Sequence, residues 1–162
     1  EVGRYQVIVN TFIMLQAGGG FLVVPFAKTL YRAGEAAVRG FARLVFGLGI
    51  VLTVFGVAAA WVLLNLVYAF GLERQWFVLG GLLVLPVFVY LPRMYQLFRA
   101  GRERAVVIIN LAGAVVNLVV SLILLQTLGA IGALIGSVVA QWLTLILIQG
   151  TDAEVHDADA LS

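Results

Sequence analysis

The sequence predicts an all-α integral membrane protein, a bundle of five transmembrane helices, and three observations carry this prediction. Hydrophobic side chains make up 63% of the 162 residues. Charged side chains make up only 11%, against roughly 25% in soluble domains. The charges also lie between uncharged stretches that are each long enough for one or two membrane-crossing helices of 20 or so residues. A water-soluble globular domain is therefore excluded.

Four uncharged stretches define the expected helices, and they cover residues 5–27, 44–72, 75–92 and 105–151. The last is long enough for two helices, with a tight turn near 127–132, where glycine and short side chains allow it. We therefore expect spans at about 5–26, 44–68, 75–98, 105–127 and 130–149. Together they form a transmembrane bundle over residues 1–149. Residues 150–162 alternate acids with small side chains and are expected to form a disordered tail.

Each span has a feature of its own. The first carries three consecutive glycines, Gly18–Gly20, and then Pro25, which weaken and kink a helix. The second follows a basic loop and carries no charge. The third contains Pro86 and Pro92. Such interruptions occur in transporters, which move between two access states, but a passive kink in a packed bundle explains them equally well.

The last two spans carry the signs of close packing. Asn110 and Asn117 in the fourth span are seven residues apart and share a helix face, with Gly113 between them. This pattern suits either hydrogen bonding to a neighbouring helix or the lining of a polar groove. Gly132 and Gly136 in the fifth span form a small-xxx-small pair, which predicts that a neighbouring helix packs closely there.

Basic side chains predict the orientation. With five spans, one side of the membrane receives eight of the ten Lys and Arg residues. These are Lys28, Arg32, Arg39, Arg43, Arg93, Arg99, Arg102 and Arg104. The other side receives Arg4 and Arg74. The positive-inside rule makes the first side cytoplasmic, so the acidic tail is expected in the cytoplasm and the N-terminal end outside. The same distribution favours a lipid bilayer over nucleic acid as the partner.

Arg93 is the charge closest to the interior of a predicted span. It either marks the end of the third span, with its side chain snorkelling to the interface, or faces a wet cavity while the helix continues. Enzymatic chemistry has no support in the pattern. The single histidine, His156, lies in the tail, no acid lies within a span, and the chain has no cysteine. We expect no catalytic residues, metal site or cofactor, and therefore no enzyme.

The order of several motifs resembles the polysaccharide flippases of the multidrug/oligosaccharidyl-lipid/polysaccharide exporter superfamily, the Wzx-type transporters. The motifs are a "vGxY" opening at Val2–Tyr5, a proline and basic segment at Pro25 and 28–43, a basic turn at 100–102, a helix with Asn110 and Asn117, and "GAIGA" at 129–133. The resemblance covers nearly all of residues 2–149.

This resemblance implies that the five helices are the larger part of one six-helix lobe in a two-lobe transporter of about twelve helices. It implies the C-terminal part of the protein, with the N-terminal lobe as a missing partner. It also implies transport of a lipid-linked oligosaccharide across the inner membrane by alternating access, as in O-antigen and lipopolysaccharide assembly. Both termini of the complete twelve-helix proteins are cytoplasmic, so the eighth helix, which is the first of these five, runs from outside to inside. This agrees with the orientation that the arginines predict independently.

A pyrophosphate headgroup needs cations or amides along its path, and a sugar needs amide and hydroxyl partners. The candidates for the substrate path are therefore Arg93, Gln96, Asn110 and Asn117. Two other functions stay open. The same architecture serves cation-coupled drug or metabolite exporters, and a small non-catalytic membrane subunit could pack against a partner through its basic loops and acidic tail.

Overall fold

The computed structural model describes residues 2–160, apart from the side chains of residues 2, 4, 35 and 152–160. Its elements are α1 (Val2–Val23), η1 (Val24–Phe26), α2 (Ala27–Arg32), α3 (Glu35–Trp61), η2 (Val62–Val67), α4 (Arg74–Arg99), α5 (Glu103–Leu128) and α6 (Ala130–Ala160). No strand occurs in this range. Five helical stretches are long and apolar enough to cross a membrane: Tyr5–Arg32, Ala36–Val67, Arg74–Arg99, Glu103–Leu128 and Ala130–Thr151. The prediction of an all-α bundle with five such helices is confirmed, and the chain has the fold of a multi-pass membrane protein.

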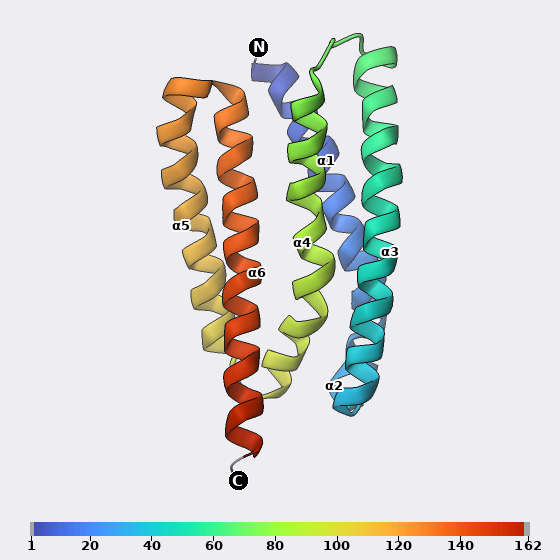
Figure 1. The fold of residues 1–162 in the computed structure, drawn as a ribbon, viewed down its shortest axis with the longest axis vertical. Helices are drawn as coiled ribbons and strands as arrows, with labels where there is room; N and C mark the ends of the chain where they lie inside the picture. Colours follow the sequence, from blue (N-terminus) through green and yellow to red (C-terminus); the bar gives the residue numbers. More distant parts are fainter. Residues whose placement is uncertain (1, 161–162) are drawn as a thin grey trace.

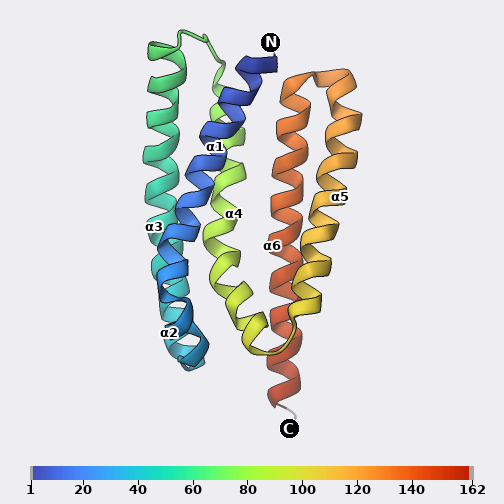
Figure 2. The same cartoon turned by 180° about the vertical axis from the view of Figure 1, so that it is seen from behind.

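Helix α4 lies at the centre of the bundle. It packs against α1 and α3 on one side and against α6 on the other, and α5 packs mainly on α6. Figure 1 shows α5, α6, α4 and α3 in a row, and Figure 2, which views the bundle from behind, shows α1 crossing in front of α3 and α4. The bundle therefore has two parts, an α1–α3–α4 group and an α5–α6 hairpin, joined through the α4–α6 contact.

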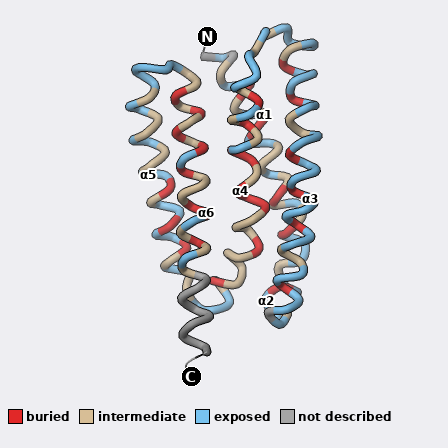
Figure 3. Tube along the Cα trace, viewed as in Figure 1, coloured by how far each residue is buried: buried red, intermediate tan, exposed pale blue. Residues whose placement is uncertain are grey.

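The buried residues follow this arrangement (Figure 3). Helix α4 carries nine of them, namely Phe77, Gly80, Leu83, Val84, Pro86, Val87, Phe88, Pro92 and Leu97. Helices α3 and α5 instead expose large apolar side chains along most of their length. This pattern suits a membrane, where lipid tails solvate an apolar outer surface as well as a protein core does.

Glycines allow the helices to approach closely. A Cβ atom added at Gly80 of α4 would lie 2.1 Å from the ring of Phe12 in α1, and one at Gly49 of α3 would lie 2.4 Å from the Phe88 ring. At Gly132 of α6 the added atom would lie 2.3 Å from the carbonyl oxygen of Leu124 in α5. The close packing that the small-xxx-small pair predicts is confirmed, because at that glycine backbone meets backbone.

The prolines and glycines interrupt the helices less than the sequence suggests. Helix α1 continues through Gly18–Gly20 and changes to a tighter 3₁₀ turn only at Pro25, which separates it from the short α2. A proline lacks the N–H that would continue the α-helical bonding, so the change of helix type falls there. Pro86 and Pro92 lie inside α4, which stays one continuous helix.

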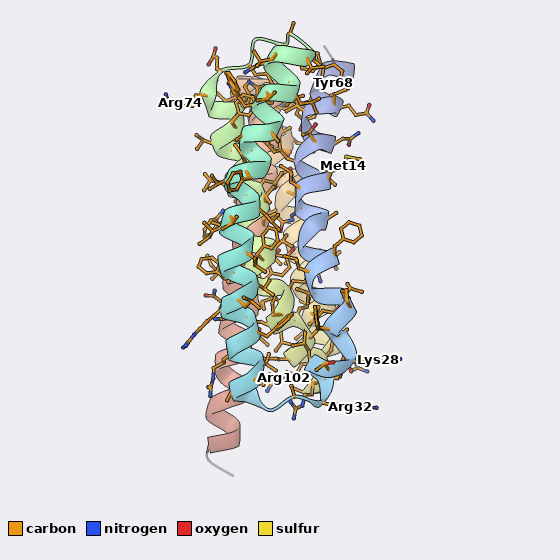
Figure 4. All side chains as sticks on the ribbon, turned by 90° about the vertical axis from the view of Figure 1, so that its right-hand side faces the viewer. Met14, Lys28, Arg32, Tyr68, Arg74 and Arg102 are labelled. Carbon is orange, nitrogen blue, oxygen red and sulfur yellow. The ribbon has the colours of Figure 1, made fainter. Side chains whose placement is uncertain are left out.

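Both predicted basic loops lie at the same end of the bundle, which we call the basic end. Arg99 at the end of α4 donates a hydrogen bond to the carbonyl of Ala33, between α2 and α3, and so ties the two loops together. Figure 4 shows Lys28, Arg32 and Arg102 at this end and Arg74 at the other.

The opposite end is held by Asn65. Helix α3 passes into a turn of π-helix at η2, and the connection from Tyr68 to Glu73 follows. The side chain of Asn65 accepts a hydrogen bond from the Leu72 N–H (2.6 Å) and donates one to the Leu72 carbonyl (3.2 Å). This amide therefore replaces the backbone partners that a loop lacks.

Two helices extend beyond the predicted spans. Helix α3 begins at Glu35, nine residues before the expected start at 44, because alanines and arginines favour helix outside the membrane as well. Helix α6 continues to Ala160, through most of the segment expected to be a disordered tail. Residues 151–160 contain no glycine or proline that would stop it. Residues 161–162 of the predicted tail, and the side chains from 152 onward, lie outside the described part.

Candidate functional site

A polar cleft lies between the two parts of the bundle. Its cavity has a volume of about 260 Å³ and is formed by α1, α4, α5 and α6. Seven polar side chains line it: Gln16, Tyr90, Asn110, Asn117, Ser137, Gln141 and Thr144. None of the described residues that line it is charged. We use the name polar cleft for this cavity below.

The polar cleft is at mid-depth of the helices that form it. Asn110 and Asn117 are the eighth and fifteenth residues of α5, and Ser137 and Thr144 hold the same places in α6. A helix of 26 residues such as α5 is about 39 Å long, so these residues lie at the depth of the hydrocarbon core of a bilayer about 30 Å thick. Polar groups at this depth are unfavourable unless they pair with one another or line a water-filled cavity.

Some of these groups pair and hold the α5–α6 hairpin together. The Oδ1 atom of Asn117 lies 3.0 Å from the Ser121 hydroxyl and 3.2 Å from the Ser137 hydroxyl, and both hydroxyls also lie 3.2 Å from the Ala133 carbonyl, so each hydroxyl shares its one proton between these two acceptors. Gly113, which has no side chain, lies against Thr144, where an added Cβ atom would be 2.6 Å from the threonine Oγ1. For Asn117, the structure supports the packing interpretation of the sequence pattern.

Other groups in the cleft are available to a ligand. Gln16 is half-buried and forms no hydrogen bond with the described residues. Asn110 uses one N–H to bond the carbonyl of Val106 (2.9 Å) in its own helix, and its Oδ1 accepts none from them. Tyr90 donates to the Oε1 atom of Gln141 (3.1 Å), which leaves the amide N–H groups of that glutamine free within the described part. The cleft thus offers both donors and acceptors without charge.

A second cavity lies at the basic end, on the outside of the bundle between α3 and α4. Its volume is about 310 Å³, and we call it the basic groove. It is lined by Arg39, Arg43, Arg93 and Gln96, together with Val38, Ala42, Phe46 and Val89. No carboxylate is among the described residues that line it.

The four predicted path residues therefore divide between two places. Asn110 and Asn117 lie in the polar cleft, whereas Arg93 and Gln96 lie in the basic groove, on another side of α4. Arg93 is half-buried. It lies near the end of its span, as the snorkelling interpretation predicts, and it lines a cavity, as the other interpretation predicts.

The sequence did not place five of the polar residues in the site, namely Gln16, Tyr90, Ser137, Gln141 and Thr144. A signal for three of them was present, since Ser137, Gln141 and Thr144 are spaced by four and three residues and share one face of α6. Tyr90 gives no such signal, because the rotation of α4 alone decides which way it points.

The architecture defines the class of protein as a multi-pass helical membrane protein with an uncharged polar cleft inside its bundle. Comparison with protein-family models, with curated proteins and with solved structures finds no match to the chain.

Proposed function

We propose that the chain is the C-terminal part of a membrane transporter that moves a lipid-linked oligosaccharide, a polysaccharide precursor, across the inner membrane. The polar cleft carries this proposal. Its amides and hydroxyls at mid-membrane depth can replace the water around a sugar, which presents hydroxyl groups as both donors and acceptors. An uncharged cleft suits a neutral glycan better than a cation, whose path is usually marked by acidic side chains.

The division of the bundle supports a moving part. The polar cleft lies where the α1–α3–α4 group meets the α5–α6 hairpin, and a small change at the α4–α6 contact would widen or narrow it. Helix α4 carries Pro86 between Leu82 and Tyr90, the two residues that hydrogen-bond to Trp142 and Gln141 of α6, and prolines are places where a helix bends. Alternating access needs a change of this kind around a fixed binding site.

The orientation completes the proposal. The basic end faces the cytoplasm by the positive-inside rule, so the end of α6 is cytoplasmic. The order of the motifs resembles that of Wzx-type flippases, in which a second lobe faces the first. Asn110 is exposed on the open side of the cleft, and this side is where the second lobe would pack and complete a central cavity.

Substitution of the two cleft amides that keep free hydrogen-bonding groups tests the proposal. In the source cell we expect Gln16→Leu together with Asn110→Leu to lower surface glycan and to raise the pool of lipid-linked oligosaccharide, at an unchanged level of protein. Export should fall by about tenfold or more, because a site that binds its substrate through hydrogen bonds binds it far more weakly when those bonds are lost. The matched control is Gln126→Leu, an exposed amide of α5 that does not line the cleft. Normal export by the double variant would contradict the proposal.

A further inference from the structure

The basic groove brings together three guanidinium groups and an amide from two helices. Arg39 and Arg43 are one helical turn apart on α3, and Arg93 and Gln96 are one turn apart on α4. Arg43 and Arg93 form no ion pair with the described residues. Like charges repel, so a cluster of this kind gains stability from an anion between them.

The depth of two of these arginines is informative. Arg43 directly precedes the uncharged stretch of residues 44–72, and Arg93 directly follows the stretch of residues 75–92. The two side chains therefore lie where the apolar part of each helix ends, which is the level of the lipid headgroups.

The groove is also amphipathic along the helix axis. On the side toward the membrane centre, Phe46 follows Arg43 by three residues, and Val89 precedes Arg93 by four. Phe46 is 40% exposed on the outer surface of the bundle. A ligand in this groove therefore meets cations at one end and apolar side chains at the other, next to lipid.

We propose that the basic groove binds the phosphate headgroup of an anionic glycerophospholipid, such as phosphatidylglycerol, with its acyl chains along Phe46 and Val89. Guanidinium groups bind phosphate oxygens in bidentate fashion, and basic pockets between transmembrane helices are typical sites for such headgroups. The site is separate from the polar cleft and does not depend on the proposed transport function. It would bind a resident lipid that fixes the position of α3 against α4.

A lipid fits these features better than a soluble anion. A free phosphate would use the arginines alone and leave the apolar half of the groove without a role. A lipid satisfies both halves at once, and it arrives already confined to the depth at which Arg43 and Arg93 lie.

Native mass spectrometry of the full chain in a neutral detergent tests the proposal. The protein is titrated with phosphatidylglycerol and, separately, with phosphatidylcholine of the same acyl chains. We expect tighter binding of the anionic lipid, and a loss of about 5-fold for Arg43→Gln or Arg93→Gln and about 25-fold for both, since each basic group near anionic lipid contributes about 1 kcal/mol. The matched control is the pair Lys28→Gln and Arg104→Gln, which removes two charges at the same end but outside the groove. This control pair should change the affinity for phosphatidylglycerol less than 2-fold, because charges farther from the headgroup contribute little.

Three results would overturn the proposal: an equal loss of affinity in the control pair, equal affinity for phosphatidylcholine, or displacement of the lipid by inorganic pyrophosphate at the same phosphate concentration. The last would show a site for a free anion. If the Gln variants lose helicity, Arg43→Lys with Arg93→Lys keeps the charge, and it should retain anionic-lipid preference while weakening binding by the loss of bidentate contacts. Loss of that preference in the folded Lys variant would also overturn the proposal, and so would unchanged affinity in the Gln variant. None of these outcomes bears on the polar cleft, so the two proposals fail separately.

Discussion

Replacement of Gly136 by alanine tests the packing of the α5–α6 hairpin. A Cβ atom at this position would lie 2.2 Å from the Oγ atom of Ser121, 2.7 Å from its backbone nitrogen and 3.0 Å from its Cα atom. The serine hydroxyl can rotate away, but the backbone of α5 cannot. The two helices would have to separate by about 0.7 Å to bring the nitrogen to an ordinary contact distance.

The separation has two consequences for stability. Overpacking of a tight contact destabilises by about 1–3 kcal/mol. The hydrogen bonds from Ser121 to Ala133 and from Ser137 to Asn117, each 3.2 Å long, would also lengthen, and such interhelical bonds in membranes contribute about 0.6 kcal/mol each. We expect Gly136→Ala to lower the free energy of unfolding by about 2–4 kcal/mol. Reversible unfolding in mixed detergent micelles, followed by helicity and by the fluorescence of the tryptophans, measures this change.

Gly150→Ala is the matched control for this experiment. It makes the same substitution in the same helix, but an added Cβ atom there has nothing within 4 Å. Alanine favours helix over glycine by up to about 1 kcal/mol, so the control should be as stable as the wild type or slightly more so. If Gly136→Ala is as stable as Gly150→Ala, the backbone contact between α5 and α6 is not where the structure places it.

Two further predictions concern other contacts. Asn65→Leu removes both hydrogen bonds to the loop at residues 68–73. We expect about 5- to 30-fold faster hydrogen exchange of that loop with the five helices intact, since each net bond contributes about 1 kcal/mol. Exchange that stays at the wild-type rate would show that the loop does not need this amide. Gly80→Ala should destabilise the bundle by about 1–3 kcal/mol by overpacking, because its Cβ atom would meet the ring of Phe12. Phe12→Leu in the same chain should recover part of that loss in the micelle unfolding assay, and strictly additive losses would argue against this contact.

The sequence predicts the elements of this fold well, for a physical reason. In a membrane, the length of an apolar stretch and the positions of the charges determine where a helix can cross. The structure accordingly has long apolar helices in all five predicted places. Helix ends outside the apolar stretches escape this rule, and so α3 begins earlier and α6 ends later than expected.

The candidate site is less predictable, because it depends on how the helices are rotated against one another. Asn110 and Asn117 share a face of one helix, which spacing alone reveals. No spacing reveals that Gln16 from α1 and Tyr90 from α4 join them, or that Arg93, close to Tyr90 on the same helix, faces a different groove. Those facts follow from contacts between helices that are distant in the sequence.

The most direct test of the account is whether water reaches the polar cleft in the membrane. The chain has no cysteine, so single cysteines can be labelled without background by a water-soluble thiol reagent in native membranes. The cleft positions are Asn110 and Ala114 of α5, and the matched lipid-facing positions are Leu111 and Val115 of the same helix. The account predicts that Asn110→Cys and Ala114→Cys react with the reagent and that Leu111→Cys and Val115→Cys do not. Equal protection at all four positions would show a dry bundle and would contradict a transport path through the cleft.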